Sequence, residues 1–189
     1  MSTNTTSVWR KKLKELEIVV VIPTYNNGKT LVAVIEEVCR YADDIIVVND
    51  GSTDDTTNIL EQYPAIRTIT HPVNKGKGTA LKHGLSQAKK EGFRYAITID
   101  SDGQHFASDI PCFIEAIEKE PDTLLVGARN LASDNMPGKN TFANKFSNFW
   151  FRLETGLKLE DTQSGYRLYP LRKMDVQSCW YTAKYEFEL

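Results

Sequence analysis

An acidic segment, Asp100 to His105, holds the residues whose types and spacing most strongly indicate chemistry. Alternate residues of an extended segment point the same way, so Asp100, Asp102 and Gln104 can present three oxygen ligands to one side. Hard divalent cations such as Mg²⁺ or Mn²⁺ prefer oxygen ligands and often keep a substrate phosphate in a remaining position. An acidic turn is the alternative, because Asp, Ser and Gly favour turns. The position directly after an apolar strand favours a metal site that bridges a diphosphate.

A second polar turn, Asn49 to Ser52, follows another apolar run and contains Asp50. An ionised carboxylate offers only hydrogen-bond acceptors, so Asp50 can accept the ring N–H of a nucleobase such as uracil or guanine. Asp is also a good helix N-cap, but Ser52 or Thr53 can fill that position instead. The turn therefore predicts a contact between Asp50 and a nucleoside.

A third segment, Asn74 to Gly78, places two lysines between glycines at the start of a predicted helix. Glycine permits close backbone approach, and the N–H groups and macrodipole of a helix N-terminus favour an anion. The segment has neither the P-loop spacing GxxxxGK[ST] nor the dinucleotide-binding spacing GxGxxG. It predicts a phosphate contact of another kind.

The elements that must position these segments alternate between apolar runs and helical patterns. Ile18 to Ile22 is an unbroken β-branched run, typical of a strand buried on both faces of a parallel sheet, and we expect Pro23 to end it. This alternation predicts an α/β fold with a mostly parallel central sheet flanked by helices. Further strands are expected over 45–48, 66–70, 95–99 and 123–126, and helices over 30–41, 53–63, 79–90 and 110–118.

Polar loops follow four of the expected strands. In open α/β sheets, ligands bind beyond the carboxyl ends of the strands, so we expect the four loops to meet at one edge of the sheet. These loops cover 23–27, 49–52, 71–78 and 100–105. His71 and His83 have no partner at metal-ligand spacing, so the sequence gives them no role.

The composition is that of an ordinary globular protein, with 41% hydrophobic and 25% charged residues among 189. Lys and Arg total 23 against 25 Asp and Glu, and the net charge of −2 argues against nucleic acid as a partner. Three scattered cysteines favour a reducing compartment over a disulfide framework. No apolar run approaches the length of a membrane span and no export signal is evident, so we expect a cytoplasmic location.

Three other segments have patterns of their own. Residues 8–16 combine Trp9 with basic residues, which is typical either of a helix that packs on the domain or of one that binds a surface. Residues 142–157 are helical in pattern and aromatic, and we expect them to pack in the core rather than face lipid. Residues 134–141 have the composition of a loop.

With these loops located, the chain resembles glycosyltransferase family 2, whose members have the Rossmann-like GT-A fold. The resemblance runs from about Ile18 to the end of the sequence. Four motifs occur in the family's order. They are Ile22-Pro23-Thr24-Tyr25-Asn26, Val48-Asn49-Asp50-Gly51-Ser52, Asn74-Lys75-Gly76-Lys77-Gly78 and Asp100-Ser101-Asp102.

Later residues resemble one branch of that family, the dolichyl- and polyprenyl-phosphate sugar synthases. They are Gly127-Ala128-Arg129 and Asp161-Thr162-Gln163-Ser164-Gly165-Tyr166-Arg167. The resemblance implies that Asp161, Arg129 and Arg167 take part in catalysis, Asp161 as the carboxylate and the two arginines at phosphates. It also implies metal ligands and donor contacts. The implied metal ligands are Asp100, Asp102 and Gln104, and the implied donor contacts are Pro23, Tyr25, Asp50, Lys75, Gly76 and Asp100.

The chain departs from the family pattern at two places. Asn49 stands where many relatives carry a first acidic residue, and Lys139 or Asn140 stands where relatives often carry Arg. The resemblance divides the chain into a tail with a short helix, 1–17, and a catalytic domain, 18–189. It also implies that the catalytic domain continues beyond residue 189, where further segments could contact the cytoplasmic face of a membrane.

The resemblance implies a glycosyltransferase that uses Mn²⁺ or Mg²⁺ and a nucleotide-diphosphate sugar of UDP or GDP. The implied acceptor is a polyprenyl phosphate, or another lipid phosphate, or a glycan, and the implied outcome is inversion at the anomeric carbon. Two alternatives stay open. A binding module would hold the nucleotide sugar without transfer, and a nucleotidyltransferase would release pyrophosphate, although such an enzyme needs a glycine-rich basic loop where Pro23 to Asn27 stands.

Overall fold

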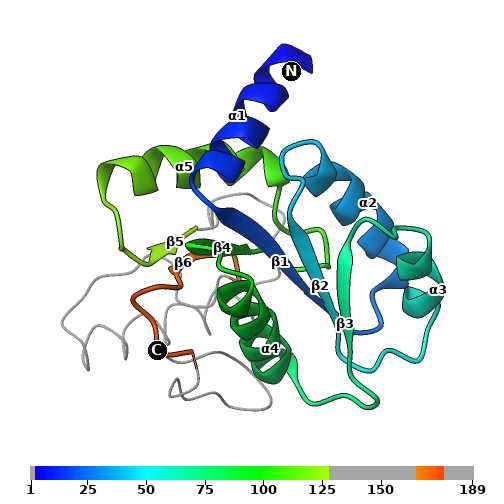
Figure 1. The fold of residues 1–189 in the computed structure, drawn as a ribbon. Coiled ribbons are helices and arrows are strands. Elements are labelled where there is room, and N and C mark those ends of the chain that lie inside the picture. Colours follow the sequence, from blue (N-terminus) through cyan, green and yellow to red (C-terminus); the bar gives the residue numbers. More distant parts are fainter. Residues whose placement is uncertain (1–2, 128–164, 177–189) are drawn as a thin grey trace, which may run out of the picture.

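The computed structural model describes residues 3–127 and 165–176, which form a six-stranded sheet between two layers of helices (Figure 1). The strand order is β3-β2-β1-β4-β6-β5. The strands are β1 (Ile18–Thr24), β2 (Ile45–Asn49), β3 (Arg67–Thr70), β4 (Tyr95–Thr98), β5 (Leu125–Val126) and β6 (Arg167–Pro170). The helices are α1 (Thr3–Glu15), α2 (Gly28–Cys39), α3 (Thr56–Glu61), α4 (Lys77–Lys90) and α5 (Ile110–Lys119), the last preceded by a 3₁₀ turn, η1 (Ala107–Asp109).

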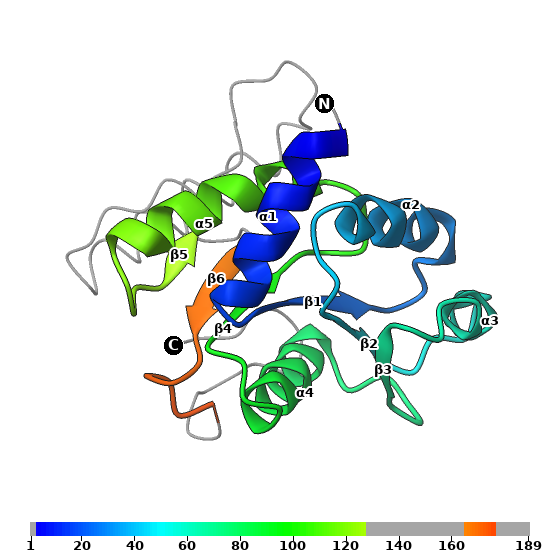
Figure 2. The same ribbon diagram turned by 45° about the horizontal axis from the view of Figure 1, so that its top comes forward.

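The first four strands are parallel, as the alternating pattern predicts. All seven residues of β1 and all five of β2 are buried, because helices cover both faces of the sheet. Side chains that alternate along a strand enter two different cores. One core packs against α1, α2, α3 and α5, and the other packs against α4. Figure 2 shows α4 on the opposite face of the sheet from α1, α2 and α5.

Pro23 does not end β1, so that expectation is wrong. The strand continues to Thr24, with Pro23 opposite Val48 of β2. The backbone N–H of Ile99 donates to Val21 O and that of Asp50 donates to Thr24 O, so the nitrogen of Pro23 faces the β4 side. Pairing with β4 has ended at Val21, and a residue without an N–H therefore costs no ladder hydrogen bond there.

The strand β6 was not expected. It runs antiparallel to both of its neighbours, β4 and β5. Its first residue, Arg167, lies opposite Thr98 at the carboxyl end of β4. This pairing brings the chain just before β6 beside the acidic segment, which begins two residues after Thr98.

The N-terminal helix packs on the domain. Leu13 of α1 is buried in the same core as β1, and Trp9 packs against that core. The ammonium of Lys12 pairs with Glu118 of α5 at 2.6 Å. Of the helices that the structure describes, none combines the length and the apolar character needed to cross a bilayer. The expected loop over 134–141 and aromatic helix over 142–157 lie outside the described residues.

Candidate active site

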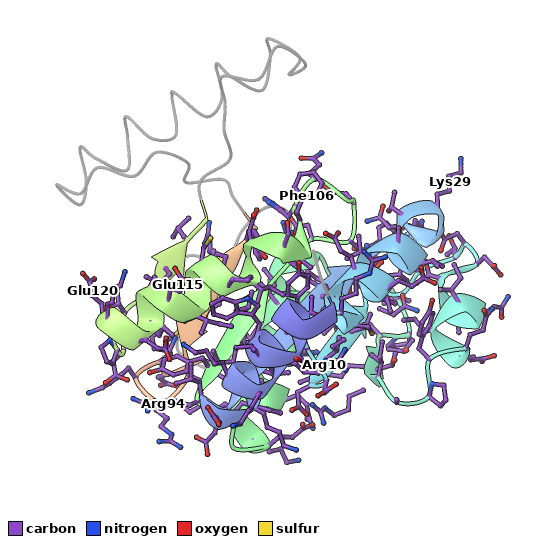
Figure 3. The ribbon with its side chains drawn as sticks, turned by 90° about the horizontal axis from the view of Figure 1, so that it is seen from above. Arg10, Lys29, Arg94, Phe106, Glu115 and Glu120 are labelled. Atoms are coloured by element: carbon purple, nitrogen blue, oxygen red, sulfur yellow. The ribbon has the colours of Figure 1, made fainter. Side chains whose placement is uncertain are left out.

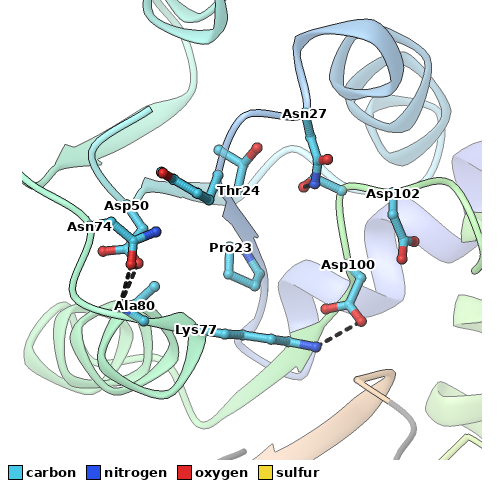
Figure 4. A pocket seen from close by; sticks show the side chains of 12 residues that line it. Pro23, Thr24, Asn27, Asp50, Asn74, Lys77, Ala80, Asp100 and Asp102 are labelled. Carbon is cyan, nitrogen blue, oxygen red and sulfur yellow. Dashed lines mark hydrogen bonds and ion pairs between the residues drawn. The ribbon is translucent and has the colours of Figure 1, made fainter. Parts of the chain in front are cut away.

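A cavity of about 400 Å³ opens where β1, β2 and β4 end and α4 begins (Figure 4). Each of the four expected polar loops contributes to its wall, so the prediction that they meet is confirmed. The lining residues are Pro23, Thr24, Tyr25, Asn27, Asp50, Asn74, Gly76, Lys77, Ala80, Asp100, Ser101 and Asp102. Asp50 and Asn74 lie on one side and Asp100 and Asp102 on the other, with Pro23 and Thr24 between them.

The acidic side of the cavity contains a lysine that the sequence analysis did not assign. Lys77, in the first turn of α4, extends across the cavity and its Nζ donates to Asp100 Oδ2 at 2.9 Å (Figure 4). Asp102 Oδ1 accepts the backbone N–H of Gln104 at 2.9 Å. The side chain of Gln104 does not line the cavity, so the structure brings two of the three predicted metal ligands together there.

The two lining carboxylates fit a hard divalent cation. Such a cation accepts one or two carboxylates and fills its other positions with water and phosphate oxygens. Among residues 3–127 and 165–176, no group of three His, Cys, Asp or Glu side chains is placed to hold a metal. Among the described residues, the acidic side of the cavity therefore offers two carboxylates to such a cation.

Gly165 lies directly against the acidic pair. A Cβ added at Gly165 would lie 2.2 Å from Asp100 Oδ2 and 2.6 Å from Oδ1. The backbone oxygen of Gly165 accepts the Thr98 hydroxyl at 2.7 Å, which fixes this segment to the end of β4. Only a residue without a side chain leaves the Asp100 carboxylate in its observed place.

On the opposite side of the cavity, Asp50 is 2% exposed and accepts three hydrogen bonds. The backbone N–H groups of Lys75 and Gly76 donate to its two oxygens at 2.9 and 2.8 Å. His71 Nδ1 lies 2.6 Å from Oδ1. Asp50 therefore holds the turn that begins α4. Gly51, at φ +71°, passes so close to Val73 that a Cβ would lie 2.4 Å from its carbonyl carbon.

One residue of the cavity wall carries a buried polar atom that lacks a partner among the described residues. Thr24 is 3% exposed, and its hydroxyl has no hydrogen-bond partner among the described residues. A buried hydroxyl without a partner costs free energy, so the position is suited to a ligand that donates or accepts there. Tyr25, at the rim, is 45% exposed and offers an aromatic face for stacking.

Side-chain hydrogen bonds connect the loops that form the cavity. Asn27 Nδ2 donates to Ser101 Oγ at 2.8 Å, and the Thr30 hydroxyl donates to Ser101 O at 2.6 Å. Asp54 accepts the backbone N–H groups of Gly28 and Thr56. Hydrogen bonding to Thr56, and after it to the Gly28 N–H, holds the pKa of the Asp54 carboxyl below its ordinary value. The acidic loop and the two turns beside it are thus fixed before any ligand binds.

A buried tyrosine supports the loop after the acidic pair. The Tyr166 hydroxyl donates to Phe106 O at 3.0 Å, and its ring contacts His105 and Phe113. Burial raises the pKa of the Tyr166 phenol well above its ordinary value, so the hydroxyl stays a donor. Phe106 itself is 60% exposed and projects from the loop before α5 (Figure 3).

The remaining predicted site residues have different outcomes. Arg167 begins β6 next to Thr98, so its backbone lies at the edge of the sheet that carries the cavity. Lys75 contributes its backbone N–H to Asp50, and its side chain does not line the cavity. Arg129 and Asp161 lie outside the described residues, and their roles stay predictions.

Sequence reasoning missed three contributors: Lys77, the Thr24 hydroxyl, and the pair formed by His71 and His83. His71 Nε2 lies 2.7 Å from His83 Nδ1. Lys77 and Thr24 belong to two of the four family motifs, so membership of a motif could have identified them as site residues. His71 lies in the loop after β3, and His83 lies 12 residues further along the chain in α4. Only the tertiary fold brings the two side chains together.

Solved structures define the class of fold as GT-A, the fold of many glycosyltransferases. Glucosyl-3-phosphoglycerate synthase from Mycobacterium tuberculosis, crystallised with Mn²⁺, UDP and phosphoglyceric acid, aligns with a TM-score of 0.65 at 23% identity. The alignment covers 88% of this chain and 60% of that one. TarS from S. aureus aligns with a TM-score of 0.61 at 18% identity, over 88% of this chain and 50% of that one.

The chain belongs to the family described as Glycosyl transferase family 2, whose profile matches residues 19–176. A UDP-N-acetylglucosamine–dolichyl-phosphate N-acetylglucosaminyltransferase from Methanococcus voltae is 31% identical, over 85% of this chain and 72% of that protein. A polyprenol monophosphomannose synthase from Mycolicibacterium smegmatis is 27% identical, over 84% and 64%. A dolichyl-phosphate β-glucosyltransferase from Trichomonas vaginalis is 28% identical, and the chain spans 52% of its length. The resemblance to this family, and to its lipid-phosphate branch, is confirmed.

Proposed function

We propose that the chain is the catalytic part of a glycosyltransferase that moves a sugar from a nucleotide-diphosphate sugar to a polyprenyl phosphate, with inversion at the anomeric carbon. The observation that carries this proposal is the cavity at the sheet edge, with Asp100 and Asp102 on one side and Asp50 on the other. The names of the relatives given above specify dolichyl or polyprenol phosphates, which supports the acceptor class.

The donor lies across the cavity in this proposal. Its nucleoside contacts Tyr25, Pro23 and Asp50, and it gives the Thr24 hydroxyl the partner that the described residues do not supply. Asp50 already accepts three hydrogen bonds, which leaves one of the roughly four acceptor positions of a carboxylate for a base N–H. UDP is the nucleotide we propose to test first, because UDP occupies the mycobacterial structure of the same fold.

The diphosphate lies between the start of α4 and the acidic pair. The N-terminus of α4 presents backbone N–H groups and a positive dipole end, and the Lys77 ammonium adds a full charge. Asp100 and Asp102 would hold Mn²⁺ or Mg²⁺, which supplies electrostatic stabilisation of the charge that develops on the leaving diphosphate. The Lys77 ammonium, beside Asp100, supplies the same kind of stabilisation.

The acceptor is a phosphate monoester, which attacks the anomeric carbon through an oxygen that is already ionised. A general base is then unnecessary, and basic side chains that orient the acceptor become the important groups. We assign this role to Arg129 and Arg167, and we assign acceptor positioning to Asp161. A lipid acceptor also requires approach to a membrane surface, and we propose that the protein acts at its cytoplasmic face.

The test is release of free nucleotide from UDP- and GDP-sugars, with Mn²⁺ and a short-chain polyprenyl phosphate. We expect release that depends on both Mn²⁺ and the acceptor, together with a glycolipid product. Nucleotide binding without transfer would instead show a binding module, and pyrophosphate release from a nucleoside triphosphate would show a nucleotidyltransferase. Asp161→Asn should lower kcat more than it weakens donor binding.

A further inference from the structure

We infer that His71 is a positioning residue for the donor site, acting through Asp50. This inference rests on the proposed function, because it concerns how the same cavity is held ready for a nucleotide. His71 does not line the cavity. Its ring lies behind Asp50, and it is 4% exposed.

Two hydrogen bonds connect Asp50, His71 and His83. Asp50 accepts as a carboxylate, so His71 Nδ1 carries the proton of the 2.6 Å bond to Oδ1. His71 Nε2 lies 2.7 Å from His83 Nδ1, and the donor of this second bond depends on the tautomers of the two rings. The two rings meet edge to face, with centroids 4.7 Å apart.

Asp50 transmits this restraint to the cavity. Its two oxygens accept the N–H groups of Lys75 and Gly76, at the turn from which α4 starts. The same turn supplies Gly76 and Lys77 to the cavity wall. When His71 fixes the orientation of the Asp50 carboxylate, the N–H groups of Lys75 and Gly76 and the first turn of α4 are fixed with it. Loss of the His71 bond leaves Asp50 held by the two backbone N–H groups alone, so the turn that begins α4 is held less firmly.

Two backbone N–H groups, those of Lys75 and Gly76, are therefore held through an imidazole that the sequence motifs do not include. Removal of one partner from a buried, charge-assisted hydrogen bond is costly, because the group left behind is desolvated and unpaired. Loss of this hydrogen bond should weaken binding of the donor and not of the acceptor, since the acceptor contacts proposed above lie on other segments. We expect KM for the nucleotide sugar to rise while the acceptor KM stays near its original value.

Two substitutions separate positioning from simple loss of packing. The amide nitrogen of an asparagine lies close to the place of His Nδ1, so His71→Asn retains a donor to Asp50 and loses only the contact with His83. The amide of a glutamine reaches the place of Nε2, so His71→Gln retains a contact with His83 and loses the donor to Asp50. Both variants have similar polarity and size.

The experiment measures UDP affinity by calorimetry with Mn²⁺ for the full chain and both variants. We expect His71→Gln to weaken UDP binding about ten-fold and His71→Asn to stay within about three-fold of the original, because only the former breaks a hydrogen bond to a charge. Equal affinity of His71→Gln and the unmutated chain would overturn the inference, and so would equal losses in both variants.

A measurement on the unmutated chain covers the case in which a variant fails to fold. A proton held between His71 Nδ1 and Asp50 should give a low-field NMR signal, and UDP with Mn²⁺ should shift it and slow amide exchange at Lys75 and Gly76. An unchanged signal and unchanged exchange on saturation would overturn the inference. If the unmutated chain binds neither UDP nor GDP, the proposed function itself fails; if it binds and only the histidine results disagree, this inference alone fails.

Discussion

Lys77 and Asp100 form an ion pair across the candidate donor site, with Nζ 2.9 Å from Oδ2. Lys77 belongs to α4 and Asp100 follows β4, so the pair connects the basic and acidic walls of one cavity. The ammonium neutralises the Asp100 carboxylate, which shares one side of the cavity with Asp102. It also stands where a diphosphate would pass between these walls.

The first prediction concerns this lysine. Lys77→Met should weaken UDP binding about ten-fold, since a charge-assisted contact to phosphate is lost. Lys77→Arg keeps the positive charge and should retain most of the affinity. Calorimetric titration with UDP and Mn²⁺ measures both variants. Binding by Lys77→Met that matches the unmutated chain would remove the lysine from the donor site.

Gly165 provides the second prediction. A methyl group at this position would lie 2.2 Å from Asp100 Oδ2, so Gly165→Ala must displace the carboxylate. We expect Mn²⁺-dependent UDP affinity to fall by about ten-fold or more, which is the scale of one lost charged contact.

Gly127→Ala is the matched control for Gly165→Ala. It adds the same methyl group beside β5, 3.1 Å from the Phe113 ring and from Tyr166 O, away from Asp100. Thermal unfolding shows what each methyl group costs the fold. Equal UDP affinities in the two variants would mean that the place of Asp100 does not matter.

The buried Thr24 hydroxyl gives the third prediction, in which stability and binding change in opposite directions. Thr24→Val replaces the hydroxyl with a methyl group of similar shape and removes a buried polar atom that has no partner among the described residues. The free energy of unfolding should rise by about 1 kcal/mol. UDP affinity should fall, because the hydroxyl is a predicted ligand contact. A fall in stability would show that the hydroxyl has a partner in the folded chain.

The fourth prediction concerns pH and His83. Burial, and then the neighbouring His71 and Lys75, hold the pKa of His83 below its ordinary value of 6.5, although Asp50 opposes them. The unfolded chain therefore takes up this proton at a higher pH than the folded chain does. The free energy of unfolding should decline as pH falls from 6.5 toward the lower folded pKa.

The His83→Gln variant isolates this contribution. Urea unfolding of both chains between about pH 7 and pH 5 gives the slope of stability against pH. The slope should be shallower in the variant, because one of the groups that binds more protons in the unfolded chain is gone. Identical slopes would mean that His83 titrates alike in the folded and unfolded chains.

Local sequence patterns predicted the parallel half of the sheet and the meeting of its four loops. The strand Ile18–Thr24 is buried on both faces, and its run of apolar residues indicates that burial. By contrast, β6 has four residues, and its pairing joins Thr98 to Arg167 across 69 positions in the chain. Nothing in four residues specifies a partner so distant.

Some polar residues of the site could likewise be predicted from the sequence, and others could not. Asp50, Asp100 and Asp102 were found because they stand directly after strands. The ion pair of Lys77 and the contact between His71 and His83 depend on how α4 packs on the sheet, so no spacing along the chain reveals them. The sequence also expected Pro23 to stop β1, since it could not show that pairing on that side had already ended.

The central claim is that Asp100 and Asp102 hold a divalent cation and, through it, the diphosphate of a nucleotide sugar. The most direct measurement is UDP binding by calorimetry, with and without Mn²⁺, for the unmutated chain, Asp102→Ala and Asp109→Ala. Asp109 is an exposed carboxylate of η1 that does not line the cavity, so it serves as the control. We expect Mn²⁺-dependent binding in the unmutated chain and in Asp109→Ala, and its loss in Asp102→Ala with the fold retained. Undiminished Mn²⁺-dependent binding by Asp102→Ala would contradict the account.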